Sequence, residues 1–533
     1  MKAGLLRPTT GVRLVNSPWG DDACRFNAVA RIGGELHGIL KKRRSPFVVD
    51  RVVGGSVYRA YDFDRKLIET YTSLLGDKFL GGQVHEPLSN VRNDWGRIVA
   101  ANLKFKHEPL RAGELGDYFL AETPGRWLDY GTVDDFAGRP CPRDEVEFWQ
   151  ETERAVRRQA ARFGSRFSYC EGSKHGELVW HAFYRLGARS CLAEVGPWAS
   201  QQSQFAIASL RGAARAAGKP WGVFFAPWGP RGCTSFMPEQ DWSWQCPRKF
   251  FDALNWPVDA NSGPSTALQR RIFFHTYLSG AWTLHEEWGA EGNLTDCEQG
   301  RLSCNGRVTR DFLDFQEQNP DVGEPYTPLA LVLDPQMPTP ATDRWARLKA
   351  ALFQFDATDR ANAARQTSSP MEAACYAPCV VPEVFDLVPG DAPLRVWKNY
   401  RAMISVGDGD FSFDHVMARA RNLSPFGITA HLPMQINQRK RDGAWILGLY
   451  NPWGAKRGDV ENVGSILDDV CTARAVLRPR FAVRSLRVLH GWPSGTTARQ
   501  RGNPIEVVIG PGGTLVLAVM PASNWRLKQQ RGL

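Results

Sequence analysis

The chain has 533 residues, of which 43% are hydrophobic and 23% charged, and its formal net charge is +10. This balance is ordinary for a globular protein and excludes a mainly disordered or fibrous chain. At about 150 residues per domain, the length predicts about three domains. No run approaches the roughly 18 consecutive apolar residues of a membrane-spanning helix, and the first residues lack the apolar core of a signal peptide. We therefore expect a cytoplasmic protein with no membrane partner.

Cysteine spacing and basic residues exclude two further classes. The 11 cysteines are scattered and contain no paired C-x-x-C sets, which argues against a structural zinc site and favours reduced, buried thiols. The longest basic run, residues 41–44, is expected to be the solvated end of a helix. No basic stripe with interleaved aromatics follows, so we expect no nucleic-acid partner. The positive charge leaves an anionic polysaccharide open as a substrate.

Apolar runs typical of strands alternate with amphipathic stretches over the first 335 residues. The expected strands are residues 12–15, 47–52, 79–86, 166–171, 191–195, 223–228, 281–287 and 329–334. The expected helices are residues 61–76, 145–163, 176–187, 201–218, 266–279 and 308–318, and residues 87–142 are expected to be a long irregular insertion. The alternation predicts an α/β (β/α)8 TIM barrel. A doubly wound open sheet is the alternative, but no strand is followed by a G-x-G-x-x-G turn.

The pattern changes after residue 334. Helical stretches at 343–356 and 412–422 and a strand at 401–406 indicate a second, small α/β domain. From about residue 430 the pattern is β, with apolar runs separated by glycine-rich turns, which predicts a C-terminal β-sandwich. The expected domains are residues 1–335, 336–428 and 429–533.

Several expected barrel strands end in a carboxylate with glycine or proline close behind: Glu86, Glu171, Glu194 and the pair Glu286-Glu287. Catalytic residues of a barrel lie at the C-terminal ends of its strands. A general acid needs a carboxyl group whose pKa is raised by burial or a like charge, and an ionised carboxylate about 5 Å away serves as nucleophile. Ion pairing is the structural alternative for each. Because adjacent strand residues face opposite ways, only one of Glu286 and Glu287 faces the mouth, and we favour Glu287.

Histidines and tryptophans accompany these carboxylates. His85 and His285 each precede a strand-end glutamate, and each is expected either to hydrogen-bond a carboxylate or sugar hydroxyl or to be structural. The 19 tryptophans often adjoin glycine or proline, and their faces suit sugar rings or the core. The expected substrate-binding residues are His85, Glu86, Trp198, Gln201, Trp228, His285, Trp288 and Asn293. With no H-E-x-x-H or G-x-S-x-G motif, we expect neither a metal, a cofactor nor a serine nucleophile.

Short motifs in fixed order carry a resemblance to a known group of enzymes. FLGGQVHE, SYCEG, CLAEVGPW, RGAARAAGKPWGVFFAPWG and YLSGAWTLHEEWGAEGN together resemble a clan A glycoside hydrolase barrel. YTPLALVLD and APLRVWKNYRAMISVGD are similar to the amidotransferase-like second domain of family 42 β-galactosidases, and GAWILGLYNPWG resembles their C-terminal sandwich. The resemblance covers most of the chain in domain order.

The resemblance implies roles for particular residues. In clan A the acid/base ends strand 4 and the nucleophile ends strand 7. Counting residues 12–15 as strand 1 makes Glu171 the acid/base and Glu287, or Glu286, the nucleophile. Without that strand the acid/base is Glu194. Clan A enzymes usually carry asparagine before the acid/base, whereas Cys170 and Ala193 stand at these positions. The second domain lacks a G-x-C-x-G turn, so we expect it to be non-catalytic, and the resemblance implies a trimer.

The expected function is a retaining glycoside hydrolase that cleaves a β-linked oligo- or polysaccharide, galactose-containing or anionic, with two glutamates. Two alternatives stay open. A non-catalytic saccharide-binding protein on the same barrel fits the missing asparagine. A lyase or isomerase acting on an acidic sugar fits the positive charge.

Overall fold

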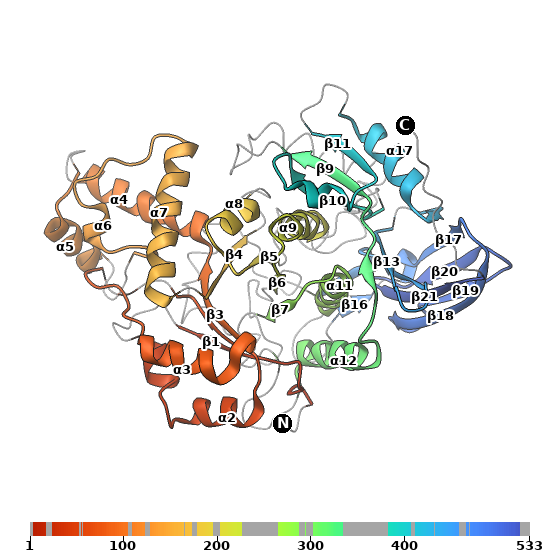
Figure 1. The fold of residues 1–533 in the computed structure, drawn as a ribbon, viewed down its shortest axis with the longest axis horizontal. Helices are drawn as coiled ribbons and strands as arrows, with labels where there is room; N and C mark the ends of the chain where they lie inside the picture. The colour runs from red at the N-terminus through yellow and green to blue at the C-terminus, as the bar shows by residue number, and fades with distance from the viewer. Residues whose placement is uncertain are drawn as a thin grey trace. The chain divides into compact units, whose positions relative to one another are not determined.

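The computed structural model places most of the chain in defined elements (Figure 1). The described residues are 4–16, 24–52, 55, 57–104, 109–122, 128–164, 166–172, 179–195, 203–225, 265–286, 294, 302–333, 382–406, 411–430, 432–457, 465–467 and 469–522. Within these ranges no helix has the length and apolarity needed to cross a membrane. The chain divides into a first unit, Leu6–Glu194, and a second unit, Val195–Leu533 with Met1–Leu5.

Parallel strands in chain order build the first unit. They are β1 (Val12–Val15), β2 (Phe47–Asp50), β3 (Phe79–His85), β4 (Phe167–Gly172) and β5 (Ser190–Val195). Each pairs in parallel with the next. Every residue of β2, β4 and β5 is buried, as expected for parallel strands covered on both faces. The predicted strand at residues 12–15 is therefore confirmed as the first strand of the sheet.

Helices follow most of these strands. They are α1 (Arg25–Val29), α2 (Glu35–Arg43), α3 (Arg65–Leu75), α4 (Pro87–Lys104), α5 (Ala112–Glu122), α6 (Val133–Phe136), α7 (Glu145–Phe163) and α8 (Val179–Arg185), with a short 3-10 turn, η1 (Gly76–Lys78). The basic residues at the end of α2 are exposed, which confirms the predicted solvated helix end.

The predicted irregular insertion at residues 87–142 is wrong, because it contains α4, α5 and α6. Helix α4 starts at Pro87, and proline suits the first helical position because its missing N–H would have no intrahelical partner. Leu88, Val91, Trp95 and Ile98 recur at helical spacing and are all buried. The sequence contains this helical periodicity, but the polar residues between the apolar ones make it hard to recognise.

The second unit begins with more elements of the same kind. Strands β6 (Trp221–Phe225) and β7 (Thr283–Glu286) pair in parallel, and the helices are α9 (Ser203–Ala217), α11 (Thr266–Leu278) and α12 (Cys304–Gln318). Within each unit the parallel strands pair in chain order, β1 to β5 in the first and β6 with β7 in the second. Among the described residues, seven parallel strands alternating with helices give a TIM-barrel-like α/β fold, as the sequence predicted, although eight strands were expected.

The predicted eighth barrel strand, residues 329–334, lies in another sheet. Strand β9 (Leu329–Leu333) is the middle of a three-stranded parallel sheet between β10 (Phe385–Pro389) and β11 (Ala402–Ser405), with α16 (Leu394–Trp397) and α17 (Phe413–Leu423) nearby in sequence. The apolar run LALVL correctly indicates a buried strand. It carries no information about which neighbouring strands supply its hydrogen bonds, and here those strands come later in the chain.

Antiparallel sheets occupy the C-terminal part, and the β-sandwich domain stays a prediction. One has the order β12 (Phe426–Ile428), β17 (Ala473–Pro479), β20 (Ile505–Ile509), β19 (Thr497–Gln500). The other has the order β18 (Val483–Trp492), β21 (Thr514–Pro521), β14 (Trp445–Tyr450), β13 (Met434–Gln438), β8 (Glu324–Pro325). A two-stranded ribbon joins β15 (Ala455–Arg457) to β16 (Ser465–Leu467), and a 3-10 turn, η6, spans Asp469–Cys471. The predicted boundaries at 335 and 428 stay predictions.

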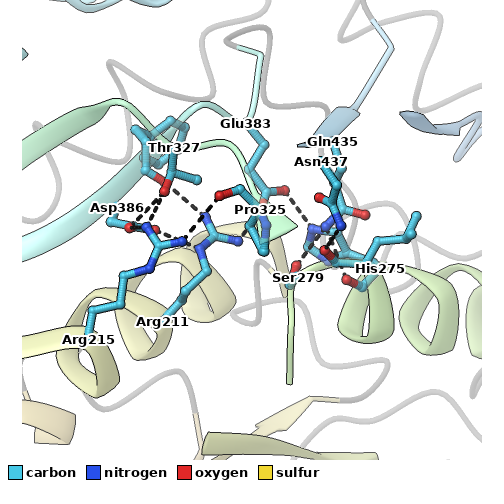
Figure 2. A network of polar contacts seen from close by, with 12 residues as sticks. Arg211, Arg215, His275, Ser279, Pro325, Thr327, Glu383, Asp386, Gln435 and Asn437 are labelled. Atoms are coloured by element: carbon cyan, nitrogen blue, oxygen red, sulfur yellow. Dashed lines mark hydrogen bonds and ion pairs between the residues drawn. The ribbon is translucent and has the colours of Figure 1, made fainter. Parts of the chain in front are cut away.

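A buried ion-pair network ties α9 to the three-stranded sheet within the second unit (Figure 2). Arg211 donates to Asp386 at 2.6 Å, to Glu383 at 2.9 Å and to the backbone oxygen of Phe385 at 2.9 Å. Arg215 binds the second oxygen of Asp386. Burial by itself raises the pKa of Asp386, but the two arginines outweigh it and hold that pKa below its usual value.

The same network continues to α11 and β13. His275 Nε2 lies 2.6 Å from Glu383 Oε2. Gln435 Nε2 on β13 donates to the backbone oxygen of His275 at 3.1 Å and to Ser279 Oγ at 2.6 Å. Two helices and two sheets of the second unit are therefore joined by one connected set of buried polar contacts, as Figure 2 shows.

Asp386→Asn tests the strength of this network. The substitution keeps the volume but removes the charge facing two arginines, and loss of one partner of a buried pair costs about 3–5 kcal/mol. Urea unfolding should show that loss. The matched control is Glu324→Gln, which breaks the 2.6 Å Lys440–Glu324 pair whose side chains are 77% and 68% exposed; its cost should stay below about 1 kcal/mol. Equal costs for the two variants would contradict the stabilising role of the network.

His490 makes the stability of the fold depend on pH. Its ring stacks on Phe274 with centroids 4.2 Å apart, and burial, assisted by the charge of Arg270, lowers its pKa to about 3. The unfolded chain binds the proton near pH 6.5, so this contribution is complete above that pH and is lost as the pH falls below it. Relative to His490→Phe, the wild type should lose about 2 kcal/mol of unfolding free energy between pH 7 and pH 5. If the unfolding free energies of the wild type and His490→Phe, measured in urea, changed with pH in the same way, the role of His490 would be refuted.

Candidate active site

Strand register brings five polar side chains to one face of the first unit's sheet. Asp50 on β2 pairs in register with Gln83 on β3, and His85 pairs with Cys170 on β4. Gly172, two residues after Cys170, pairs with Glu194 on β5. Since in-register neighbours and residues two apart point the same way, Asp50, Gln83, His85, Cys170 and Glu194 share a face. All five are buried, and we call them the polar cluster.

His85 lies at the centre of the polar cluster. Its Nε2 is 3.6 Å from Glu194 Oε2 and 4.0 Å from Glu86 Oε2. Its Nδ1 is 3.4 Å from Gln83 Nε2 and 3.8 Å from Asp50 Oδ1. Carboxylates therefore lie on both nitrogen-bearing sides of one imidazole.

Bonds to Asp50 and to the backbone of His85 fix the cluster further. Gln83 Nε2 donates to Asp50 Oδ1 at 2.7 Å, and Arg13 pairs with Asp50 Oδ2 at 2.5 Å. The Tyr130 hydroxyl donates to the backbone oxygen of His85. These partners come from β1, β3 and the segment before α6, so several elements hold the site in place.

Burial keeps two members of the cluster uncharged near neutral pH. It lowers the pKa of His85 well below its ordinary value, and the positive charges of Arg51 and Arg13 lower it further. It also raises the pKa of the Cys170 thiol well above the usual value, and the nearby carboxylates, Glu194 first among them, add to that rise. A neutral imidazole and a protonated thiol therefore lie beside the carboxylate of Glu194.

The backbone is strained directly after the cluster residues of β2 and β3. Arg51 has φ 56° and Glu86 has φ 46°, the left-handed region that non-glycine residues rarely occupy. Such a conformation costs roughly 1–2 kcal/mol per residue. Strain of this kind persists only where the surroundings impose it, and it gathers at functional sites. Here it follows Asp50 and His85 directly.

Glu171, the expected strand-4 acid/base, points away from the polar cluster. It alternates with Cys170 along β4, so its side chain lies on the opposite face. Its Oε2 accepts from the backbone N–H of Leu88 at 2.8 Å, and Oε1 lies 3.4 Å from Ser89 Oγ. Glu171 therefore binds the first turn of α4, where a carboxylate interacts favourably with free N–H groups and the helix dipole.

Glu286 also faces helices. Its carboxylate lies 3.4 Å from Gln269 Nε2 on α11 and 3.3 Å from Thr309 Oγ1 on α12. The preceding residue, His285, therefore points to the other face of β7, where its ring lies edge-on to Phe224 at 6.3 Å. Glu286 is therefore engaged with α11 and α12, and the preference for Glu287 stays a prediction.

The remaining expected site residues lie outside the described residues: Trp198, Gln201, Trp228, Glu287, Trp288 and Asn293. The sequence interpretation also missed Asp50, Gln83 and Cys170, which the register adds to His85 and Glu194. Asp50 ends an apolar strand in the same way as the glutamates do, so the same signal could have found it. Cys170 and Gln83 carry no comparable signal, because a polar residue inside a strand is equally typical of a satisfied structural position.

Comparisons with known proteins return weak structural similarities. No protein-family model matches the chain, and no curated protein matches its sequence. Among solved structures, alpha-L-fucosidase isoenzyme 2 from Paenibacillus thiaminolyticus aligns with a TM-score of 0.39 at 10% identity, over 97% of this chain and all of the other. The alpha-amylase from H. orenii aligns at 0.24 and 11% identity over 76% of this chain and 63% of the other.

A third structure is the GH27 β-L-arabinopyranosidase from Geobacillus stearothermophilus, with a TM-score of 0.24 at 10% identity over 99% of this chain and 100% of the other. These proteins are glycoside hydrolases by name. Because none of the TM-scores reaches 0.5, the similarities by themselves assign neither a fold family nor an activity to the chain.

Glu171→Ala tests the capping role of that carboxylate. Removing it leaves the buried N–H of Leu88 without its acceptor, which should lower the free energy of unfolding by about 1–3 kcal/mol. Amide hydrogen exchange should accelerate in the first turn of α4, measured against α7 as an internal reference. Unchanged exchange and stability would show that Glu171 does not hold this helix.

Proposed function

We propose that the chain is a glycoside hydrolase in which Glu194 is the general acid/base. One observation carries the proposal: the Glu194 carboxylate is buried at the C-terminal end of β5, 3.6 Å from a neutral His85. In a barrel-like parallel fold the strand ends at this edge are where catalytic groups lie. With β1 present, the strand count implied by the resemblance favours Glu171 instead, but the Glu171 carboxylate is engaged with the first turn of α4.

In the proposed reaction Glu194 protonates the leaving glycosidic oxygen while a second carboxylate attacks the anomeric carbon. A covalent glycosyl-enzyme forms, and Glu194 then removes a proton from the water that hydrolyses it. His85 orients Glu194 through the Nε2 side of its ring. Asp50 and Gln83 orient His85 from the Nδ1 side.

The nucleophile is the residue that the sequence predicts, Glu287. Support comes from strand alternation, since its neighbour Glu286 contacts α11 and α12. The resemblance to family 42 β-galactosidases supports a β-linked, galactose-containing substrate, and the net charge of +10 keeps anionic polysaccharides among the candidates. Trp198, Trp228 and Trp288 remain the proposed stacking residues, and Gln201 and Asn293 the proposed hydroxyl contacts.

Leaving-group dependence tests these roles. Product release would be measured on aryl glycosides with good and poor leaving groups and on neutral and anionic polysaccharides. Glu194→Gln should lower kcat/KM by about 100- to 10,000-fold for poor leaving groups and much less for good ones, which depart without protonation. Glu287→Gln should abolish turnover of both, because the bond-forming group is lost.

Glu171→Gln is the matched control, a second strand-end glutamate on the opposite face. It should retain activity once its lower stability is allowed for. If Glu171→Gln shows the leaving-group dependence and Glu194→Gln does not, the strand-4 assignment replaces this one. If the wild type binds a polysaccharide but cleaves none of the substrates, a non-catalytic saccharide-binding protein becomes the better description.

A further inference from the structure

Three members of the polar cluster offer the donor atoms of a metal site. His85, Cys170 and Glu194 each present one ligand atom, nitrogen, sulfur and oxygen, and these atoms all lie within 4.8 Å of one another. All three side chains are buried. They come from three consecutive strands, β3, β4 and β5, whose pairing fixes their spacing.

We propose that His85, Cys170 and Glu194 bind a soft divalent cation of the Zn²⁺ type. A thiolate, an imidazole and a carboxylate are common zinc ligands, and the sulfur disfavours Mg²⁺ and Ca²⁺, which prefer oxygen. In a tetrahedral site with metal–ligand bonds of about 2.0–2.3 Å, donor atoms lie roughly 3.5 Å apart. A modest inward movement of side chains already within 4.8 Å therefore reaches that geometry.

The surroundings of His85 suit a ligand histidine. Its Nε2 faces Glu194 at 3.6 Å, which makes Nε2 the metal-binding nitrogen. Asp50 Oδ1 lies 3.8 Å from Nδ1, the place of the carboxylate in carboxylate–histidine–zinc arrangements. Gln83 and Arg13 hold Asp50 in turn at 2.7 and 2.5 Å. An orienting shell is thus built behind the ligand.

The charge balance also fits. Binding displaces the proton of the Cys170 thiol, so M²⁺ and the thiol give the metal thiolate and one released H⁺. Coordinated as a carboxylate, Glu194 supplies the second negative ligand, so two negative ligands neutralise the divalent ion. Three protein ligands leave a fourth position open to water or another small ligand.

Metal binding has a consequence for activity that rests on the proposed function. A cation coordinated by Glu194 occupies the carboxylate that would protonate the leaving oxygen. Zn²⁺ should therefore inhibit hydrolysis, and a chelator should restore it. The binding itself requires no hydrolytic activity.

Direct binding measurements test the site. The full-length, metal-free protein would be titrated with Zn²⁺ in competition with a chromophoric chelator, and Co²⁺ would be used as a spectroscopic probe. We expect one ion bound per chain, release of a proton and a thiolate-to-cobalt charge-transfer band. Cys170→Ser should remove that band and weaken Zn²⁺ binding by at least about 100-fold. Loss of a residue that only hydrogen-bonds a metal ligand weakens metal affinity by about 10- to 100-fold.

Cys191→Ser is the matched control. Cys191 is an equally buried cysteine on the neighbouring strand, but it alternates to the opposite face from Glu194. It should bind Zn²⁺ like the wild type. His85→Gln provides a second ligand variant if Cys170→Ser fails to fold, which circular dichroism would reveal.

The outcomes separate the two proposals. No tightly bound Zn²⁺, or a cobalt thiolate band that survives in both Cys170→Ser and His85→Gln, overturns the metal site. Zn²⁺ binding lost in these variants supports it, even if the wild type hydrolyses no glycoside. If hydrolysis depends on Glu194 but the protein binds no Zn²⁺, the proposed enzyme activity is supported and the metal site is overturned.

Discussion

Successive residues of a β-strand point to opposite faces, and parallel pairing carries this alternation from one strand to the next. In this chain the constraint decides which strand-end carboxylates share a site. Glu194 falls on the same face as His85 and Cys170. Glu171, one residue beyond Cys170, falls on the face of α4 and binds its first turn. A shift of one residue in the register of β4 would exchange the places of Cys170 and Glu171.

Burial gives the polar cluster its chemical character. An exposed histidine between carboxylates would carry a proton at mildly acidic pH, whereas burial and two nearby arginines keep His85 neutral. A neutral imidazole can orient a carboxyl group, and it is also the form that binds a metal. His85 and Glu194 therefore suit proton transfer and, together with Cys170, cation binding. Because both uses need Glu194, the two proposals exclude each other at any one moment.

In the second unit, the buried charges of Arg211, Glu383 and Asp386 are paired with opposite charges. Arg211 would be costly in the interior alone, but Asp386 and Glu383 satisfy it, and the partly buried Arg215 binds Asp386 and Thr327. Replacing both partners of a buried ion pair with apolar groups is often tolerated. Removing only one partner is not, because it leaves the other charge buried and unpaired. The network thus fixes which helix packs on which strand. It joins α9 to a sheet whose middle strand, β9, would read as a barrel strand from its apolar pattern alone.

By itself, the sequence determined the strands β1 to β7 and most of the helices between them, because apolar runs and helical periodicity are local properties, but it did not reveal helices α4, α5 and α6. Strand-end residues such as His85 and Glu194 could be predicted for the same reason. The sequence did not determine that β9 leaves the barrel, since its hydrogen-bond partners lie more than 50 residues later.

Only the tertiary structure decided which polar residues meet. Asp50, His85, Cys170 and Glu194 are far apart in the chain, and strand register, not spacing, places them together. Their short motifs therefore predicted neither the partner of Glu194 nor a metal site. The capping of α4 by Glu171 was hidden in the same way, because α4 itself was predicted as irregular chain. Pairing of distant strands is a non-local interaction, and this is the physical reason that local patterns cannot reveal it.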